Sequence, residues 1–149
     1  MSHYKIILLA VDFSSHSGLV IERARLLAQQ NGAQLHLVHV VDYMPMVGTE
    51  FGEMVPFAYD VSDELLTSSR KHLARLADSL GIAGSQTHLQ VGSVKHEVVQ
   101  VATTLGVDLI VIGSHGWRGL ELLLGATADG ILHHAPCDVI VVRAVADSN

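Results

Sequence analysis

Uninterrupted apolar runs alternate along this chain with segments that have a helical period. The run Ile6 to Val11 (IILLAV) has no polar residue, which is typical of a strand buried on both faces of a parallel sheet. Ser85 to Val91 alternates only weakly and predicts a strand near a sheet edge. The other strands expected from apolar runs are Gln34 to Val41, Asp108 to Gly113 and Asp138 to Ala144.

Four helices are expected between these strands, because apolar residues recur there at helical spacing. Ser14 and Ser15 can cap the first helix, and Gly32 ends it. The first helix ends near Asn31, and the others are expected at Val61 to Leu80, Val94 to Leu105 and about Thr127 to His134. The alternation of strands and helices over residues 1–149 predicts a single α/β domain. Its core is a doubly wound five-stranded parallel sheet with helices on both faces.

One long stretch, Asp42 to Asp60, has no regular period and contains two prolines and two glycines. Loops of this length in a compact domain are usually functional or mobile. Its methionines and phenylalanines, between Met44 and Phe57, could cover a ligand or a partner. They could equally belong to a plain connection with a few residues packed on the core, so both interpretations stay open.

Composition and charge narrow the classes of function. With 149 residues, 49% hydrophobic and 16% charged, the chain is expected to be compact, and no apolar run approaches the ~20 residues that cross a bilayer. The single cysteine, Cys137, forms no internal disulfide, so a cytoplasmic location is the simplest expectation. A formal net charge of −6 and scattered basic residues argue against a nucleic-acid partner.

The chemistry-bearing residues follow two of the expected strands. Asp12 comes directly after the first strand, and a glycine-rich segment from Gly113 to Thr127 follows the fourth. In doubly wound sheets, ligands bind beyond the carboxyl ends of the strands where the strand order reverses. Glycines let backbone N–H groups approach a phosphate, and a helix that starts near Thr127 adds its positive end. The alternatives are that the glycines only permit a tight turn and that Asp12 caps the next helix with Ser14.

Several familiar catalytic and metal-binding motifs are absent. The chain has no GxxxxGK[ST], no GxGxxG after the first strand and no GxSxG. His36 and His39 lie three apart on one strand and should project to opposite faces. HEVVQ, from His96 to Gln100, lacks the second histidine of a zinc motif, so no dedicated transition-metal site is expected. No general base is evident near the glycine loop apart from His115, the sole candidate, so no catalytic residue is assigned.

Three segments resemble the universal stress protein family: IILLAVDFS, LHLVHVVD and DLIVIGSHGWRGLELLLGATADGILHHAPCDVIVVRA. The resemblance implies strand order 3-2-1-4-5, a cytoplasmic location and a homodimer formed through the last strand, whose apolar edge needs cover. One branch of the family binds ATP through glycine, two residues, glycine, nine residues, then Gly-Ser or Gly-Thr. Gly113 and Gly116 match its first half. In the second half only eight residues separate Gly116 from Gly125, and Ala126 stands before Thr127.

Carried over position by position, the resemblance implies an adenine nucleotide site. Asp12 resembles the ribose and adenine contact, Val40 the position whose backbone reads the adenine, and Ile112 the apolar residue before the loop. The positions that resemble the phosphate cradle are Gly113, Ser114, Gly116, Gly125, Ala126 and Thr127. The leading hypothesis is a stress-response regulator that binds ATP or AMP, with Mg²⁺ carried by the nucleotide, and associates with an unidentified protein. The alternatives are a nucleotide-free dimeric interaction module and a slow ATP hydrolase.

Overall fold

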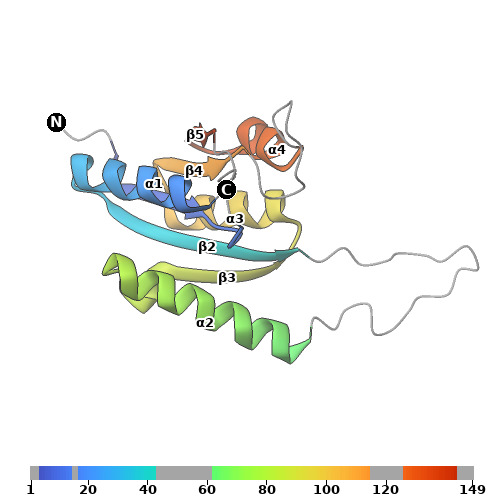
Figure 1. Ribbon diagram of the computed structural model, residues 1–149. Helices are drawn as coiled ribbons and strands as arrows, with labels where there is room; N and C mark the ends of the chain where they lie inside the picture. The colour runs from blue at the N-terminus through green and yellow to red at the C-terminus, as the bar shows by residue number, and fades with distance from the viewer. Residues whose placement is uncertain (1–3, 15–16, 43–61, 115–125, 144–149) are drawn as a thin grey trace, which may run out of the picture.

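Five parallel strands form one sheet within residues 4–14, 17–42, 62–114 and 126–143, which the computed structural model describes. The spatial order is β3-β2-β1-β4-β5 (Figure 1), which confirms the expected fold class and the implied strand order. The strands are β1 (Ile6–Ala10), β2 (Gln34–Asp42), β3 (Thr87–Gly92), β4 (Leu109–Gly113) and β5 (Asp138–Val142). β3 and β5 are therefore the two edge strands.

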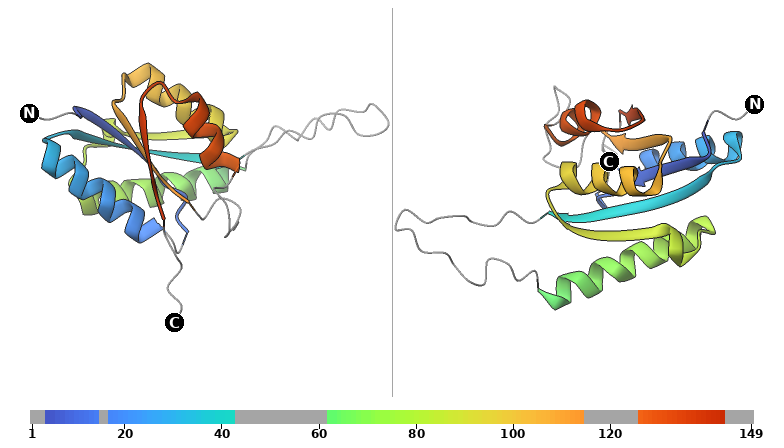
Figure 2. Two further views of the ribbon diagram at one scale, coloured as in Figure 1. Left: turned by 90° about the horizontal axis from the view of Figure 1, so that it is seen from above. Right: turned by 180° about the vertical axis from the view of Figure 1, so that it is seen from behind.

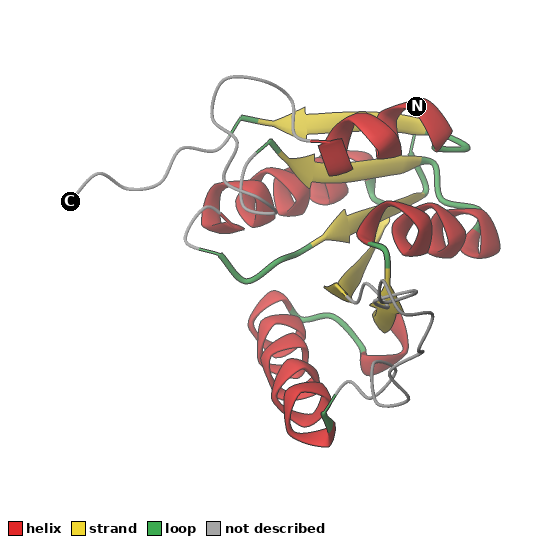
Figure 3. Cartoon of the chain, turned by 90° about the vertical axis from the view of Figure 1, so that its right-hand side faces the viewer, coloured by secondary structure: helices red, strands yellow, loops and turns green. Residues whose placement is uncertain are grey.

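Two helices cover each face of the sheet, as Figure 3 shows. α1 (Ser17–Asn31) and α2 (Asp63–Leu80) pack on one face, where Leu9, Leu37 and Val111 belong to the same buried cluster as residues of both helices. α3 (Val94–Leu105) and α4 (Ala126–His134) pack side by side on the other face (Figure 2), over Leu8, Val38 and Ile110. A short 3₁₀ turn, η2 (Gly84–Gln86), precedes β3.

Capping residues determine where the helices begin and end. The Ser62 hydroxyl accepts a hydrogen bond from the Leu65 amide at 3.1 Å, so α2 begins at Asp63, two residues later than expected. Gly81 and Gly106 adopt left-handed backbone angles with φ of 69° and 67° and end α2 and α3. β3 begins at Thr87, later than expected, because the preceding residues form η2.

The buried face of α2 is a narrow stripe. Ser69, Leu73 and Ala77 are buried, whereas Leu66, Leu76 and Leu80 are only half-buried. The buried residues are four apart, the spacing at which side chains of a helix lie one above another. Leu73 therefore faces the sheet, and the other three leucines flank the buried stripe.

Strand order reverses between β1 and β4. On one side of β1 lie β2 and β3, and on its other side lie β4 and β5. In a parallel sheet the carboxyl ends of all strands meet at one edge, and the point of reversal leaves a crevice between the loops that follow β1 and β4. The fold therefore places the two expected site segments together. Of those segments, residues 15–16 and 115–125 lie outside the described part of the chain, as does 43–61.

Candidate functional site

Apolar side chains of three neighbouring strands form the floor below the carboxyl edge. Ala10 of β1, Val40 of β2 and Ile112 of β4 are all buried in the cluster beneath α3 and α4. The register pairs Ala10 with Val38, and it pairs Leu9 with Val111, so Ala10 and Ile112 are level. Because the Val40 side chain is part of the core, only its backbone is suited to contact a ligand.

Asp12 stabilises the turn at the end of β1. Its Oδ1 accepts a hydrogen bond from the Ser14 amide at 3.0 Å. The Ser14 carbonyl in turn accepts from the amide and the hydroxyl of Ser17, the first residue of α1, at 3.1 and 2.7 Å. The Asp12 bond therefore closes a turn that precedes α1, and no bond from Asp12 to an amide of α1 is seen among the described residues. The same turn holds the half-buried carboxylate at the edge where β1 and β4 diverge.

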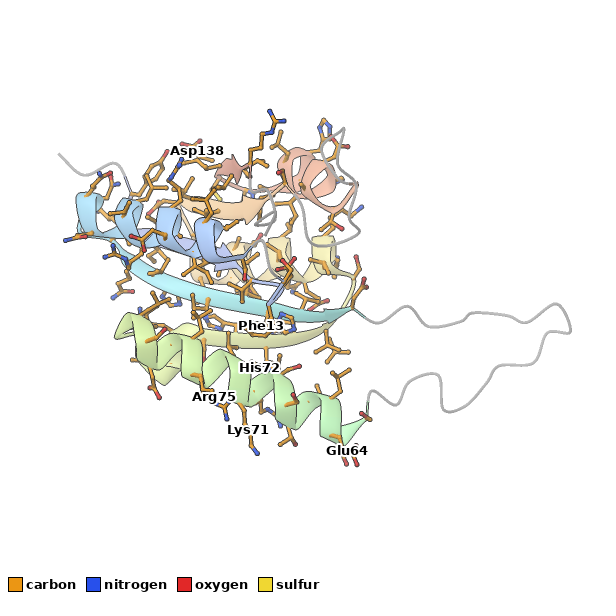
Figure 4. All side chains as sticks on the ribbon, in the orientation of Figure 1. Phe13, Glu64, Lys71, His72, Arg75 and Asp138 are labelled. Carbon is orange, nitrogen blue, oxygen red and sulfur yellow. The ribbon has the colours of Figure 1, made fainter. Side chains whose placement is uncertain are left out.

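Phe13 is held in a conformation that side chains rarely adopt. Its φ is 58°, in the left-handed region that favours glycine. Its ring lies against His39 of β2 and His72 of α2, with ring centroids 4.4 and 5.2 Å apart, and Figure 4 shows Phe13 and His72 next to one another. Such backbone strain costs about 1–3 kcal/mol and is concentrated at ligand sites and switch regions.

His39 connects the middle strands to this turn. Its Nδ1 lies 2.7 Å from the Val11 carbonyl, and a carbonyl can only accept, so Nδ1 carries the hydrogen. Burial lowers the pKa of His39, and the nearby His72 acts in the same direction, whereas the Val11 hydrogen bond and the Asp12 charge oppose it. Sequence reasoning used His39 only to argue against a metal and did not single out Phe13 or His72. The sequence gives one hint of this contact, an aromatic residue, Phe13, directly after Asp12.

Ser114, directly after β4, carries the clearest sign of an unfilled interaction. Its amide donates to the Val142 carbonyl of β5 at 2.9 Å, which fixes the backbone. Its hydroxyl oxygen is buried, yet it has no hydrogen-bond partner among the described residues. A buried polar group left unpaired costs about 1–3 kcal/mol, and native proteins have few of them. A buried hydroxyl without a described partner, beside Gly113 at the strand reversal, makes Ser114 a candidate ligand contact.

The amino terminus of α4 also lies at this edge. α4 leads into β5, so it runs antiparallel to the strands and begins near their carboxyl ends. Thr127, half-buried, is in its first turn, and the positive end of the helix dipole lies there. Of the sequence-predicted site residues, Asp12, Val40, Ile112, Gly113, Ser114 and Thr127 are thus brought to one edge, together with the backbone of Ala126. Gly116 and Gly125 lie outside the described residues.

A cleft on α2 shares His72 with the aromatic contacts around Phe13. This cleft of about 480 Å³ is lined by residues 63–75 of α2, where Lys71 and Arg75 point away from the sheet (Figure 4). The described residues contain no group of three or more potential metal ligands gathered around one point. None of the described helices combines the length and the hydropathy needed for a membrane span.

The comparisons with known proteins agree with this fold along nearly the whole chain. The sequence profile of the universal stress protein family matches residues 3–143. Universal stress protein A homolog 1 of Coxiella burnetii is 41% identical over 141 residues, covering 94% of this chain and 96% of that protein. The structure of universal stress protein UspA from Lactobacillus plantarum has a TM-score of 0.78 at 25% identity, covering 96% of this chain and 100% of the other.

Two further solved structures contain adenine nucleotides. One is a universal stress protein in complex with cAMP, with a TM-score of 0.65, covering 95% of this chain and 98% of the other. The second, from Archaeoglobus fulgidus, is in complex with dAMP, with a TM-score of 0.63, covering 95% and 99%. At 20% identity, these two matches show that the chain shares their fold. From the profile match and the Coxiella relative, the chain belongs to the universal stress protein family.

Proposed function

We propose that this protein binds an adenine nucleotide, ATP or AMP, at the carboxyl edge of β1 and β4. The nucleotide controls its association with another protein in the stress response. The single observation that carries the proposal is the buried hydroxyl of Ser114 at the strand reversal, which has no hydrogen-bond partner among the described residues. The cAMP and dAMP complexes of two universal stress proteins support the choice of an adenine nucleotide.

Each part of the nucleotide meets a suitable chemical group in this proposal. The Asp12 carboxylate accepts from the ribose hydroxyls or the adenine amine, and the Val40 backbone reads the adenine edge. Ile112 lies in the apolar floor. The phosphates lie on backbone amides and hydroxyls at the start of α4, whose dipole favours an anion. The residues that form this cradle are Gly113, Ser114, Gly116, Gly125, Ala126 and Thr127. Mg²⁺ enters with ATP, held by phosphate and water oxygens.

A homodimer formed through β5 is the second part of the proposal. β5 is an edge strand with half-buried Val139, Ile140 and Val141, so its outer side presents apolar groups and unpaired backbone. Pairing with the same strand of a second copy removes that edge. A cytoplasmic site of action agrees with Cys137, the single cysteine of the sequence, which has no second cysteine in the chain to pair with.

Binding is tested by thermal unfolding with ATP, ADP and AMP. At a hundredfold excess over the dissociation constant, a ligand adds about 2.7 kcal/mol to the free energy of unfolding. For a domain of this size that is a rise in Tm of about 5–10 °C. No shift with any of the three nucleotides would defeat the proposal. A dimer insensitive to all three would instead favour the nucleotide-free interaction module.

Ser114→Ala tests the observation that carries the proposal. The unliganded variant should be at least as stable as wild type, because the lost hydroxyl has no partner to forfeit. Nucleotide affinity should fall about tenfold, equivalent to about 1.4 kcal/mol. The matched control is Ser79→Ala near the carboxyl end of α2, where the hydroxyl donates to the Leu76 carbonyl at 2.7 Å. That control should leave nucleotide affinity unchanged.

A further inference from the structure

Gly130 stands inside α4, where a glycine is not expected. Its backbone is not left-handed, and glycine in a helix interior is about 1 kcal/mol less favourable than alanine. The reason is steric. A Cβ at this position would overlap Cδ of Lys95 and lie 2.9 Å from its Cγ. Gly130 therefore provides the space through which the aliphatic stem of Lys95 crosses from α3 onto α4.

Lys95 lies in the first turn of α3, and its stem meets α4 one turn after Thr127. Lys95 is the second residue of α3, which begins at the carboxyl edge of the sheet, as α4 does. Thr127 lies one turn before Gly130 on the same side of α4, and residues three apart have Cβ atoms about 5–6 Å from one another. A lysine stem that packs on Gly130 can thus place its ammonium at the first turn of α4, beside Thr127.

The ammonium has no charge partner in the described part of the chain. No hydrogen bond or ion pair involves Lys95 there, and Asp129, the acidic residue of α4, faces His133 at 3.3 Å instead. α3 and α4 contain no other lysine or arginine. In a chain with a formal net charge of −6, Lys95 is thus a cation without an acidic partner among the described residues, and its stem lies one turn of α4 from Thr127.

We propose that Lys95 recognises the phosphate chain of the nucleotide, so that the site selects phosphorylated adenosine over adenosine. The inference rests on the proposed function, since it assigns a residue to the same site. Backbone amides and hydroxyls orient a phosphate, but they carry no net charge. The chain lacks the lysine of a Walker motif, and Lys95 supplies a compact positive charge from a different helix.

Isothermal titration with AMP, ATP and adenosine separates this role from a structural one. Lys95→Met keeps the stem and removes the charge, so AMP and ATP should bind about tenfold more weakly while adenosine binds as before. The salt dependence of AMP binding should also decrease. The matched control is Lys71→Met on α2, also exposed, whose side chain points away from the sheet (Figure 4). It should bind all three ligands like wild type.

Gly130→Ala displaces the lysine stem without removing the charge. It should weaken AMP binding in the wild-type background and cause no further loss of AMP affinity in Lys95→Met. If Lys95→Met binds AMP like wild type, or loses adenosine equally, the inference is overturned while the nucleotide site stands. If wild type binds none of the three ligands, the proposed function fails, and the role of Lys95 fails with it.

Discussion

At the scale of single residues, three consecutive positions at the end of β1 are each held by a different interaction. The Val11 amide donates to the Val38 carbonyl at 2.9 Å, and its own carbonyl accepts from His39. Asp12 accepts from the Ser14 amide, and Phe13 lies between two histidine rings. Because all three positions are restrained before any ligand arrives, the Asp12 carboxylate does not need to be ordered on binding.

His39→Ala should destabilise the protein by about 1–3 kcal/mol, because it leaves the buried Val11 carbonyl without a donor. His39→Asn retains an N–H donor near the position of Nδ1 and should recover part of that loss. Nucleotide affinity should fall in the alanine variant, since Asp12 follows Val11 directly. The measurement is urea unfolding, with the exposed His96→Ala as the control. Equal stability of His39→Ala and wild type would show that the Val11 carbonyl does not depend on His39.

The sequence indicated some of these residues and missed others for a physical reason. Asp12 and Ser114 could be found because a polar residue directly after an apolar strand must lie at the carboxyl edge of a parallel sheet. Phe13, His39 and Lys95 could not be found in this way. Their roles arise from contacts with residues distant in the chain, such as Lys95 with Gly130. Hydrophobic periodicity reports whether a side chain is buried and carries no information about which side chain it meets.

At the scale of elements, a histidine pair joins the edge strand β3 to β2. His36 Nδ1 and His88 Nε2 are 3.1 Å apart, and the ring planes differ by 14°. One of the two nitrogens must carry the shared hydrogen, so the contact is lost when both rings are protonated. His36 also lies 3.5 Å from the Gln34 side chain on its own strand, and His39 projects to the opposite face, as the spacing predicted.

The histidine pair predicts an acid-sensitive fold. Burial lowers the pKa of His36 and of His88, and the charge of His36 lowers that of His88 further. Below the ordinary pKa of about 6.5, the unfolded chain therefore binds more protons than the folded one, and stability falls as the pH falls. Urea unfolding at about pH 7.5 and pH 5.5 should show a smaller loss for His88→Gln than for wild type. The control, His96→Gln, should retain the wild-type loss; an undiminished loss in His88→Gln would contradict the prediction.

At the scale of the whole molecule, the two sheet edges differ in kind. β3 is half-buried except at the exposed Val91, and it lies beside α2, with polar residues at Thr87, His88 and Gln90. β5 is apolar from Val139 to Val142 and ends the sheet on the other side. An apolar edge with free backbone groups favours pairing with another chain, whereas a polar edge does not. The difference favours β5 over β3 as the edge for the proposed homodimer.

Val141→Lys should convert the proposed dimer into a monomer, because a charge on the edge strand opposes pairing of two copies. Wild type should have twice the 16.0 kDa mass of one chain in light scattering after gel filtration, and the variant should have that mass once. A far-UV circular dichroism spectrum like that of wild type shows that the fold is kept. Leu65→Lys, at a residue of α2 that is 48% exposed, should remain dimeric. A dimer that survives Val141→Lys would place the interface elsewhere.

The sequence by itself determined which segments are strands and helices, their order, and therefore the parallel sheet and the edge at which a ligand can bind. Periodicity, capping residues and short connections are local properties, so they can be read along the chain. Only the tertiary structure decided that Phe13 meets His39 and His72, that His36 meets His88, and that Lys95 crosses Gly130. Those contacts depend on how helices pack on the sheet, which is set by the fit of many side chains at once.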